Sequence, residues 1–264
     1  MIQENEIFIG RKEELKRISE ALQKGKHVLL LGKNGCGKTA LVLEFIRRNA
    51  QENHNLKILL SSQSGSLKDT CLSLVGSLCR LGLLVKFPKE LQRIGPDEPW
   101  EKIKPHFLRL RTTVLKNLVF NHIQGVKNLI VVLDHLGKVK SKFFFFLDSL
   151  RDQAKLILIA RGVQKKETGQ LWMMLWGFEQ IKVEPLTSDE AKRLAAHWLG
   201  GASVDTADQK KWYREAVRLS GGNPEILRGL CDEIRKQSLE KRGEIHVRLA
   251  NIDRQITSLQ KEEE

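Results

Sequence analysis

The chain lacks the residue patterns of a metal-bound, disulfide-bonded or membrane protein. Its 264 residues include four scattered cysteines and no C-x-x-C pair, which indicates neither a zinc site nor a disulfide framework. No run of eighteen apolar residues is present, and the N-terminus is acidic rather than basic and then apolar. We therefore expect a soluble, cytoplasmic protein that is long enough for one large α/β domain and a small helical one, with no membrane partner.

Positive charge is concentrated in one quarter of the sequence. The formal net charge is +13, and between Lys102 and Lys166 a total of 14 Lys and Arg residues stand against three acids. Such a cluster predicts a polyanionic partner such as nucleic acid, although solvated helix faces would give the same composition. We expect Lys138, Lys140 and Lys142 to contact DNA phosphates without reading the base sequence, because no helix-turn-helix or winged-helix reader follows Gln237.

A complete phosphate-binding loop is present at residues 32–39, which read G-K-N-G-C-G-K-T. An apolar run of strand type precedes it at residues 27–31, and apolar residues at helical spacing follow it at 40–46. Glycines allow the backbone N–H groups to converge on an anion at the positive end of the helix. Lys38 would reach the β- and γ-phosphates, and the Thr39 hydroxyl would ligate Mg²⁺. The expected nucleotide contacts are Gly32, Asn34, Gly35, Cys36, Gly37, Lys38, Thr39 and Ala40.

Cys36 lies inside this loop and is interpreted as a small residue of convenience. We expect its thiol to be exposed, and therefore to be a candidate for inhibition by thiol reagents.

A second apolar run, at residues 129–133, ends in the carboxylate of Asp134. A near-continuous apolar run is typical of a central parallel strand that is buried on both faces. Asp134 would then lie at the carboxyl end of the strand, where open α/β sheets bind ligands. We interpret Asp134 as the acid on the Mg²⁺ side of the site; the alternative is an Asp that only caps the next turn.

Strands and helices alternate through the first 184 residues, which predicts a parallel sheet covered by helices, as in P-loop NTPases. Further strands are expected at residues 56–60, 155–161 and 180–183. Helices are expected at 12–22, 67–84 and 106–123, with an irregular excursion from Pro88 to Pro105.

From Pro185 onward the pattern is helical only. A capping sequence starts a helix through Leu199, a second spans roughly residues 206–219, and a third follows Gly221-Gly222-Asn223-Pro224. We expect an ATPase domain at 1–184, a helical lid at 185–237 and a helical tail at 238–264. The apolar seam between Ile245 and Leu259 fits either self-association or one more helix packed on the lid.

These residues together resemble the AAA+ and STAND branches of the P-loop ATPases, over roughly residues 7–237. Residues 7–15, I-F-I-G-R-K-E-E-L, look like the family's adenine-side motif F-x-G-R-x-x-E-L, which includes Gly10 and Arg11. Arg161 matches the sensor arginine that approaches the γ-phosphate in STAND proteins. Residues 183–191 are similar to the link into the helical lid, and Gly222-Asn223-Pro224 to its G-x-P turn, where Pro224 would lie near the adenine. The resemblance implies ATP and Mg²⁺ as cofactors.

One position departs from the family pattern. A second acid often follows the Mg²⁺-side Asp and polarises the attacking water, but this chain has His135 there. A neutral imidazole can accept a proton, but its direction and charge differ from those of a carboxylate, so we expect slow hydrolysis. The expected catalytic residues are Lys38, Asp134, His135 and Arg161. Alternatively, His135 only packs or caps while Gln63 orients water, and Arg161 is an ordinary surface arginine. The region of Arg151 is a possible source of an arginine supplied to a neighbouring subunit.

Two functions fit this pattern. The first is an ATP-dependent, slowly hydrolysing switch that forms homo-oligomers with ATP and binds DNA non-specifically, similar to AAA+ regulators of transposition or replication initiation, and that has room for a further protein partner. The second is a STAND-type signalling or defence ATPase whose basic face does not bind nucleic acid. The chain has no room for the effector domain and sensor repeats that STAND proteins usually carry, which favours the first.

Overall fold

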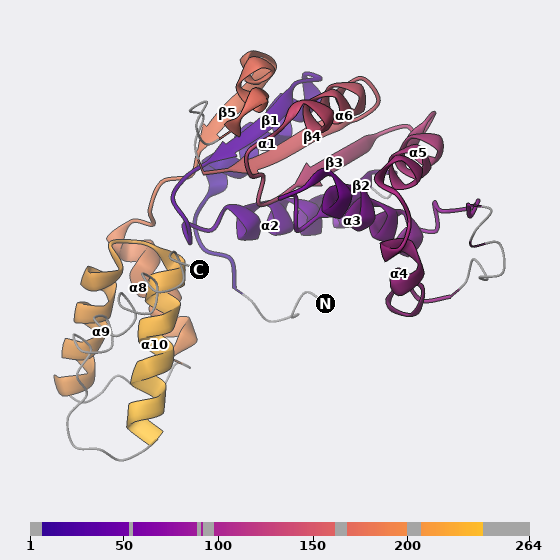
Figure 1. Ribbon diagram of the computed structural model, residues 1–264. Coiled ribbons are helices and arrows are strands. Elements are labelled where there is room, and N and C mark those ends of the chain that lie inside the picture. Colours follow the sequence, from indigo (N-terminus) through magenta and orange to yellow (C-terminus); the bar gives the residue numbers. More distant parts are fainter. Residues whose placement is uncertain are drawn as a thin grey trace. The chain divides into compact units, whose positions relative to one another are not determined.

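A computed structural model describes residues 7–52, 55–88, 91, 98–161, 168–199 and 207–239, and these residues form two compact units (Figure 1). One unit contains residues 13–32 and 41–182, that is, the sheet and its helices. The other contains the described residues of 1–12, residues 33–40 and the helices that follow residue 183. Among the described helices, none combines the length and the apolar character needed to cross a membrane.

The sheet consists of five parallel strands in the order β2-β3-β4-β1-β5. Every residue of β3 is buried, because helices cover both faces of a parallel sheet. The predicted fold class is confirmed, and the strands begin and end within two residues of their predicted positions. Their bounds are β1 (His27–Leu31), β2 (Lys57–Ser61), β3 (Leu129–Leu133), β4 (Lys155–Ala160) and β5 (Phe178–Lys182).

Helices fill the connections between these strands. Alternate strand residues such as Leu59 and Val131 form one core cluster with apolar side chains of the helices between β2 and β4. Two of these helices, α3 and α5, pack against each other, and α4 packs against α3 (Figure 1). The helices of this part of the chain are α1 (Lys12–Gln23), α2 (Lys38–Glu52), α3 (Leu67–Arg80), α4 (Trp100–Leu108), α5 (Thr112–Ile123) and α6 (Ser141–Arg151).

The prediction was wrong between Leu81 and Arg111. Helix α3 ends at Arg80 rather than at residue 84, and α4 forms inside the segment that was expected to be irregular. The single helix expected over 106–123 is broken before α5 begins at Thr112. Tertiary packing explains α4, because its buried Trp100 lies against Gly76 of α3: a Cβ added at Gly76 would be 2.6 Å from Trp100 Cε2. Local periodicity carries no signal for such a contact.

The second unit contains the helices α8 (Ser188–Trp198), α9 (Ala207–Ser220) and α10 (Pro224–Leu239), which lie side by side (Figure 1). They share a core that includes Ala195, Ala216 and Leu227, and Ile9 packs against it. A capping box between Thr187 and Glu190 starts α8. The apolar seam predicted at residues 245–259 lies outside the described residues, and the domain boundaries stay predictions.

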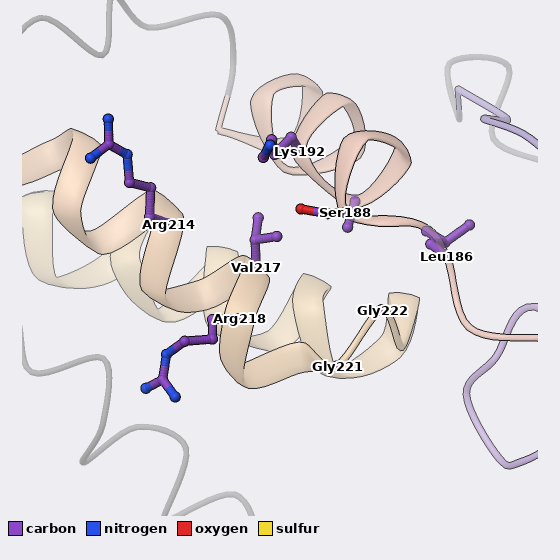
Figure 2. A pocket seen from close by; sticks show the side chains of 9 residues that line it. Leu186, Ser188, Lys192, Arg214, Val217, Arg218, Gly221 and Gly222 are labelled. Atoms are coloured by element: carbon purple, nitrogen blue, oxygen red, sulfur yellow. The ribbon is translucent and has the colours of Figure 1, made fainter.

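A cavity of about 340 Å³ opens between α8 and α9. Figure 2 shows Ser188 and Val217 directed into it, whereas the guanidinium groups of Arg214 and Arg218 point away. The lining is largely apolar on its inner side, and the charges lie at its rim. The cavity therefore has no converging charged groups that would make it a site for chemistry.

Candidate nucleotide site

The phosphate loop connects β1 to α2, and its backbone has the conformation that the glycines allow. Gly35 and Gly37 have φ values of +73° and +92°, a region that residues with a Cβ rarely adopt. Lys38 is the first residue of α2 and is 9% exposed, and its Nζ donates a hydrogen bond to the carbonyl of Lys33 at 2.9 Å. The ammonium group is therefore held at the loop itself. The expectation that Cys36 is exposed is wrong, because its side chain is 3% exposed.

The start of α10 contacts the phosphate loop directly. Asn223 Nδ2 donates to the carbonyl of Asn34 at 2.8 Å, and the Glu225 N–H donates to the carbonyl of Gly35 at 3.3 Å. Asn223 Oδ1 also accepts the N–H groups of Glu225 and Ile226, which caps the helix. A Cβ at Gly35 would collide with the Glu225 carboxylate, so glycine permits this close approach. Asn223 and Glu225 were not predicted as site residues, although an Asn directly before a helix-starting Pro is a signal in the sequence.

The predicted adenine-side residues lie in the same unit as the loop. Arg11 is 8% exposed, and its Nη2 donates to the carbonyl of Cys36 at 3.1 Å. Gly10 has a φ of +74°, and a Cβ there would collide with the Glu190 carboxylate at the start of α8. Pro224 is also close, since a Cβ at Gly37 would be 3.8 Å from Pro224 Cγ. The structure thus brings Arg11 and Pro224 to the phosphate loop.

The carboxyl ends of β2 and β3 are tied together around Asp134. The Asp134 N–H donates to the carbonyl of Ser61 at 2.9 Å, and the Ser64 N–H donates to the carbonyl of Asp134 at 3.0 Å. The Asp134 side chain is 3% exposed, and its Oδ1 accepts the N–H of His135 at 2.7 Å. The carboxylate is therefore fixed in orientation at the edge of the sheet where ligands bind in open α/β folds.

His135 follows Asp134 in a left-handed backbone conformation, with a φ of +53°. Its side chain is 74% exposed, and Nε2 lies 3.9 Å from Asp134 Oδ2. The imidazole is therefore solvent-accessible rather than packed. Arg161, directly after the neighbouring strand β4, and Gln63, after β2, are also exposed at this edge.

The three candidate DNA-contacting lysines surround the start of α6. Lys138, Lys140 and Lys142 are all exposed, and none forms an ion pair within the described part of the chain. Val139 between them is buried and forms a parallel bridge with Gly169. The lysines therefore project from a backbone segment that Val139 anchors to residues 168–170.

Comparison with solved structures decides the fold. The chain matches the Orc1 protein of Aeropyrum pernix in complex with DNA, with a TM-score of 0.64 and 15% identity over 94% of this chain and 66% of that one. It also matches a Walker-type ATPase of Pyrococcus abyssi, with a TM-score of 0.61 and 15% identity over 97% and 74% of the two chains. This is the fold of the AAA+ P-loop ATPases.

A third AAA+ structure covers the same part of the fold. Domain III of the replication initiation protein DnaA of Thermotoga maritima matches with a TM-score of 0.53 and 16% identity over 93% of this chain and 91% of that one. No protein-family model and no curated protein matches the sequence. The chain spans just under two thirds of the Orc1 chain. The likeness therefore establishes the AAA+ fold, and any activity has to be argued from the residues of the site.

Proposed function

We propose that the protein is an ATP-binding, slowly hydrolysing AAA+ switch that forms homo-oligomers and binds DNA non-specifically. The observation that carries the proposal is the phosphate loop, with two glycines at positive φ and a buried lysine at the start of the following helix. Backbone N–H groups in such a loop bind phosphate oxygens, and the helix dipole adds to the attraction. Lys38 would exchange the Lys33 carbonyl for the β- and γ-phosphates, a stronger partner because the hydrogen bond is then between two charged groups.

The residues present also fit a magnesium ion. Mg²⁺ keeps several waters and is usually held by one or two protein oxygens together with the substrate phosphates. Thr39 and Asp134 would supply those oxygens, so the lack of any three-residue cluster of metal-binding side chains among the described residues is no obstacle. When bound, the ion would neutralise charge that develops on the phosphates.

Slow turnover follows from the residue next to Asp134. His135 would polarise water less strongly than a carboxylate, and its imidazole side chain is 74% exposed. Arg161, which forms no hydrogen bond or ion pair within the described residues, would approach the γ-phosphate.

The lid would sense the nucleotide through the loop. Asn223 and Glu225 hydrogen bond to loop carbonyls, so a loop that moves on phosphate binding must break or shift these contacts. Such a change in α10 is a route by which ATP could alter the surfaces that join subunits. A further protein partner is compatible with this switch.

The DNA-binding part of the proposal depends on Lys138, Lys140 and Lys142. Their charges carry no ion-pair partner among the described residues, and non-specific DNA binding depends on phosphate neutralisation. The Orc1 structure, which was solved with DNA, agrees with this direction. The alternative is STAND-type signalling, which is favoured by the position of Arg161 directly after β4.

Sizing the purified protein would test the two functions. Three samples are needed: ADP, a non-hydrolysable ATP analogue, and the analogue with DNA. The switch on DNA predicts assembly that DNA promotes. Assembly with the analogue alone, unaffected by DNA, would favour signalling instead.

A further inference from the structure

Four large apolar side chains are exposed on α6 and on two short 3₁₀ helices, η2 (Gln170–Met173) and η3 (Leu175–Gly177). Their exposed fractions are 63% for Phe145, 38% for Trp172, 45% for Met173 and 86% for Trp176. We refer to these four residues as the aromatic strip. A single exposed apolar residue is common, but several exposed on elements that contact one another indicate an interaction site.

The aromatic strip and the three lysines belong to one packed piece of structure. Gln170 N–H donates to the Val139 carbonyl at 2.9 Å, and Val139 N–H donates to the Thr168 carbonyl at 3.1 Å. A Cβ at Gly169 would be 3.1 Å from Lys138 Cγ, so the Lys138 side chain lies over the start of η2. Helix η2 in turn packs against α6. The segment that carries the lysines therefore contacts the start of η2, and η2 contacts both α6 and η3, the elements that carry the strip.

The charge around the strip is positive. Lys138, Lys140 and Lys142 have no ion-pair partner in the described residues. The described carboxylates within three residues of the strip in the chain are both paired: Asp148 with Arg151 at 2.9 Å, and Glu179 with Arg17 at 2.9 Å and Lys26 at 3.5 Å. A ligand here meets cations at one end and aromatic faces beyond them.

We propose that the lysines and the aromatic strip together bind single-stranded nucleic acid. The lysines would contact the phosphates, and Trp172 and Trp176 would stack on unpaired bases. A duplex hides the faces of its bases, so it could use the lysines but not the indoles. The inference rests on the DNA-binding part of the proposed function and specifies the form of nucleic acid that the surface selects.

Charge distinguishes this ligand from a protein partner. Trp and Met are also enriched at protein interfaces, but lysine is depleted there. Three lysines without an ion-pair partner among the described residues favour a ligand that supplies negative charge at regular intervals, as a phosphate backbone does. A polyanion that also offers flat apolar faces fits both features.

Fluorescence anisotropy with labelled oligothymidine and with a duplex of equal length tests the inference on the full chain with the ATP analogue present. The parent should bind the single strand more tightly. Trp176→Ala should weaken single-strand binding about tenfold and leave duplex binding unchanged, whereas Trp176→Phe should retain most of the affinity. Val85→Ala, at another apolar residue that is 70% exposed, is the matched control and should change neither.

The lysines are tested in the same assay. The simultaneous change of Lys138, Lys140 and Lys142 to Gln should weaken the binding of both nucleic acids. It should also reduce the slope of log affinity against log salt concentration by up to about three. The control is a second triple change to Gln, at three lysines that are exposed elsewhere on the same unit: Lys86, Lys104 and Lys127. It removes the same charge and should have a smaller effect on binding.

Equal binding of single strand and duplex with no effect of Trp176→Ala would overturn the single-strand inference and leave DNA binding standing. A change in oligomeric size on Trp176→Ala without a change in DNA affinity would overturn it in favour of contact between copies of the chain. If the parent binds neither single-stranded nor duplex DNA, the DNA-binding part of the proposed function is overturned as well. ATP binding is measured separately, so neither of these results bears on it.

Discussion

Glycines with the same backbone conformation have different surroundings in this protein, and the sequence does not distinguish them. Gly25 and Gly35 both have positive φ, of +78° and +73°. No atom lies within 4 Å of a Cβ added at Gly25, whereas at Gly35 the Cβ would meet the side chains of Glu225 and Asn223. The sequence predicted a glycine-rich loop at Gly35, but only the structure shows that the lid occupies the space beside it.

Gly35→Ala and Gly25→Ala form a matched pair for this reason. Each places a Cβ in the left-handed region, which costs about 1 kcal/mol of unfolding free energy. Gly35→Ala should in addition displace α10 from the loop and weaken ATP binding, while Gly25→Ala should leave ATP affinity unchanged. Urea unfolding and titration with ATP measure the two effects; equal ATP affinity in both variants would contradict the role given to Gly35.

His135→Glu tests the residue beside Asp134. The carboxylate would be a stronger water-polarising group than the imidazole, so turnover at saturating ATP should rise. His135→Asn is the control, because Asn tolerates the left-handed φ of this position without supplying an acid. A lower rate in the Glu variant, with ATP affinity retained, would show that the imidazole itself is required.

At the level of elements, burial on both faces made the central strands easy to predict. β1 and β3 match their predicted bounds because they are near-continuous apolar runs. Helix α4 was missed because it contains Pro105 and depends on Trp100 packing against Gly76, a contact between residues distant in sequence. For the site, the loop and Asp134 carry sequence signals, whereas Asn223 and Glu225 reach the loop only through the tertiary fold.

Asn223→Ala separates the two roles of the α10 cap. It removes the N-cap, which should cost about 1 kcal/mol of stability, and also the hydrogen bond to the Asn34 carbonyl. Thr187→Ala removes the α8 cap at a similar cost, and the hydrogen bonds of Thr187 within the described residues are to Glu190 and Ala191 rather than to the loop. Thermal unfolding should therefore report similar losses, while only Asn223→Ala changes ATP affinity. Identical ATP affinities would argue against coupling between lid and loop.

At the scale of the whole molecule, the phosphate loop groups with the lid, whereas Asp134 and Arg161 belong to the sheet unit. The residues proposed to hold ATP and Mg²⁺ therefore come from both units: Lys38 and Thr39 belong to the unit that contains the lid, and Asp134 belongs to the sheet unit. The sequence predicted both groups of residues, but it carried no signal for the grouping of the loop with the lid.

Asp134→Asn tests the Mg²⁺ role proposed for Asp134. The substitution weakens the placement of Mg²⁺ rather than the phosphate cradle, so turnover should fall far more than ATP affinity. Steady-state hydrolysis and equilibrium binding, measured on the same preparation, check the difference. A parallel loss of both would place Asp134 in nucleotide binding itself.

The most direct test of the central claim is the affinity of the parent protein and of Lys38→Ala for ATP with Mg²⁺, measured by calorimetric titration. We expect the parent to bind ATP and Lys38→Ala, although folded, to bind it at least about tenfold more weakly, because a hydrogen bond to a charged group contributes about 1.5–3 kcal/mol. Lys33→Ala removes an exposed lysine from the same loop and should bind ATP like the parent. No ATP binding by the folded parent, or equal affinity in the parent and Lys38→Ala, would contradict the account.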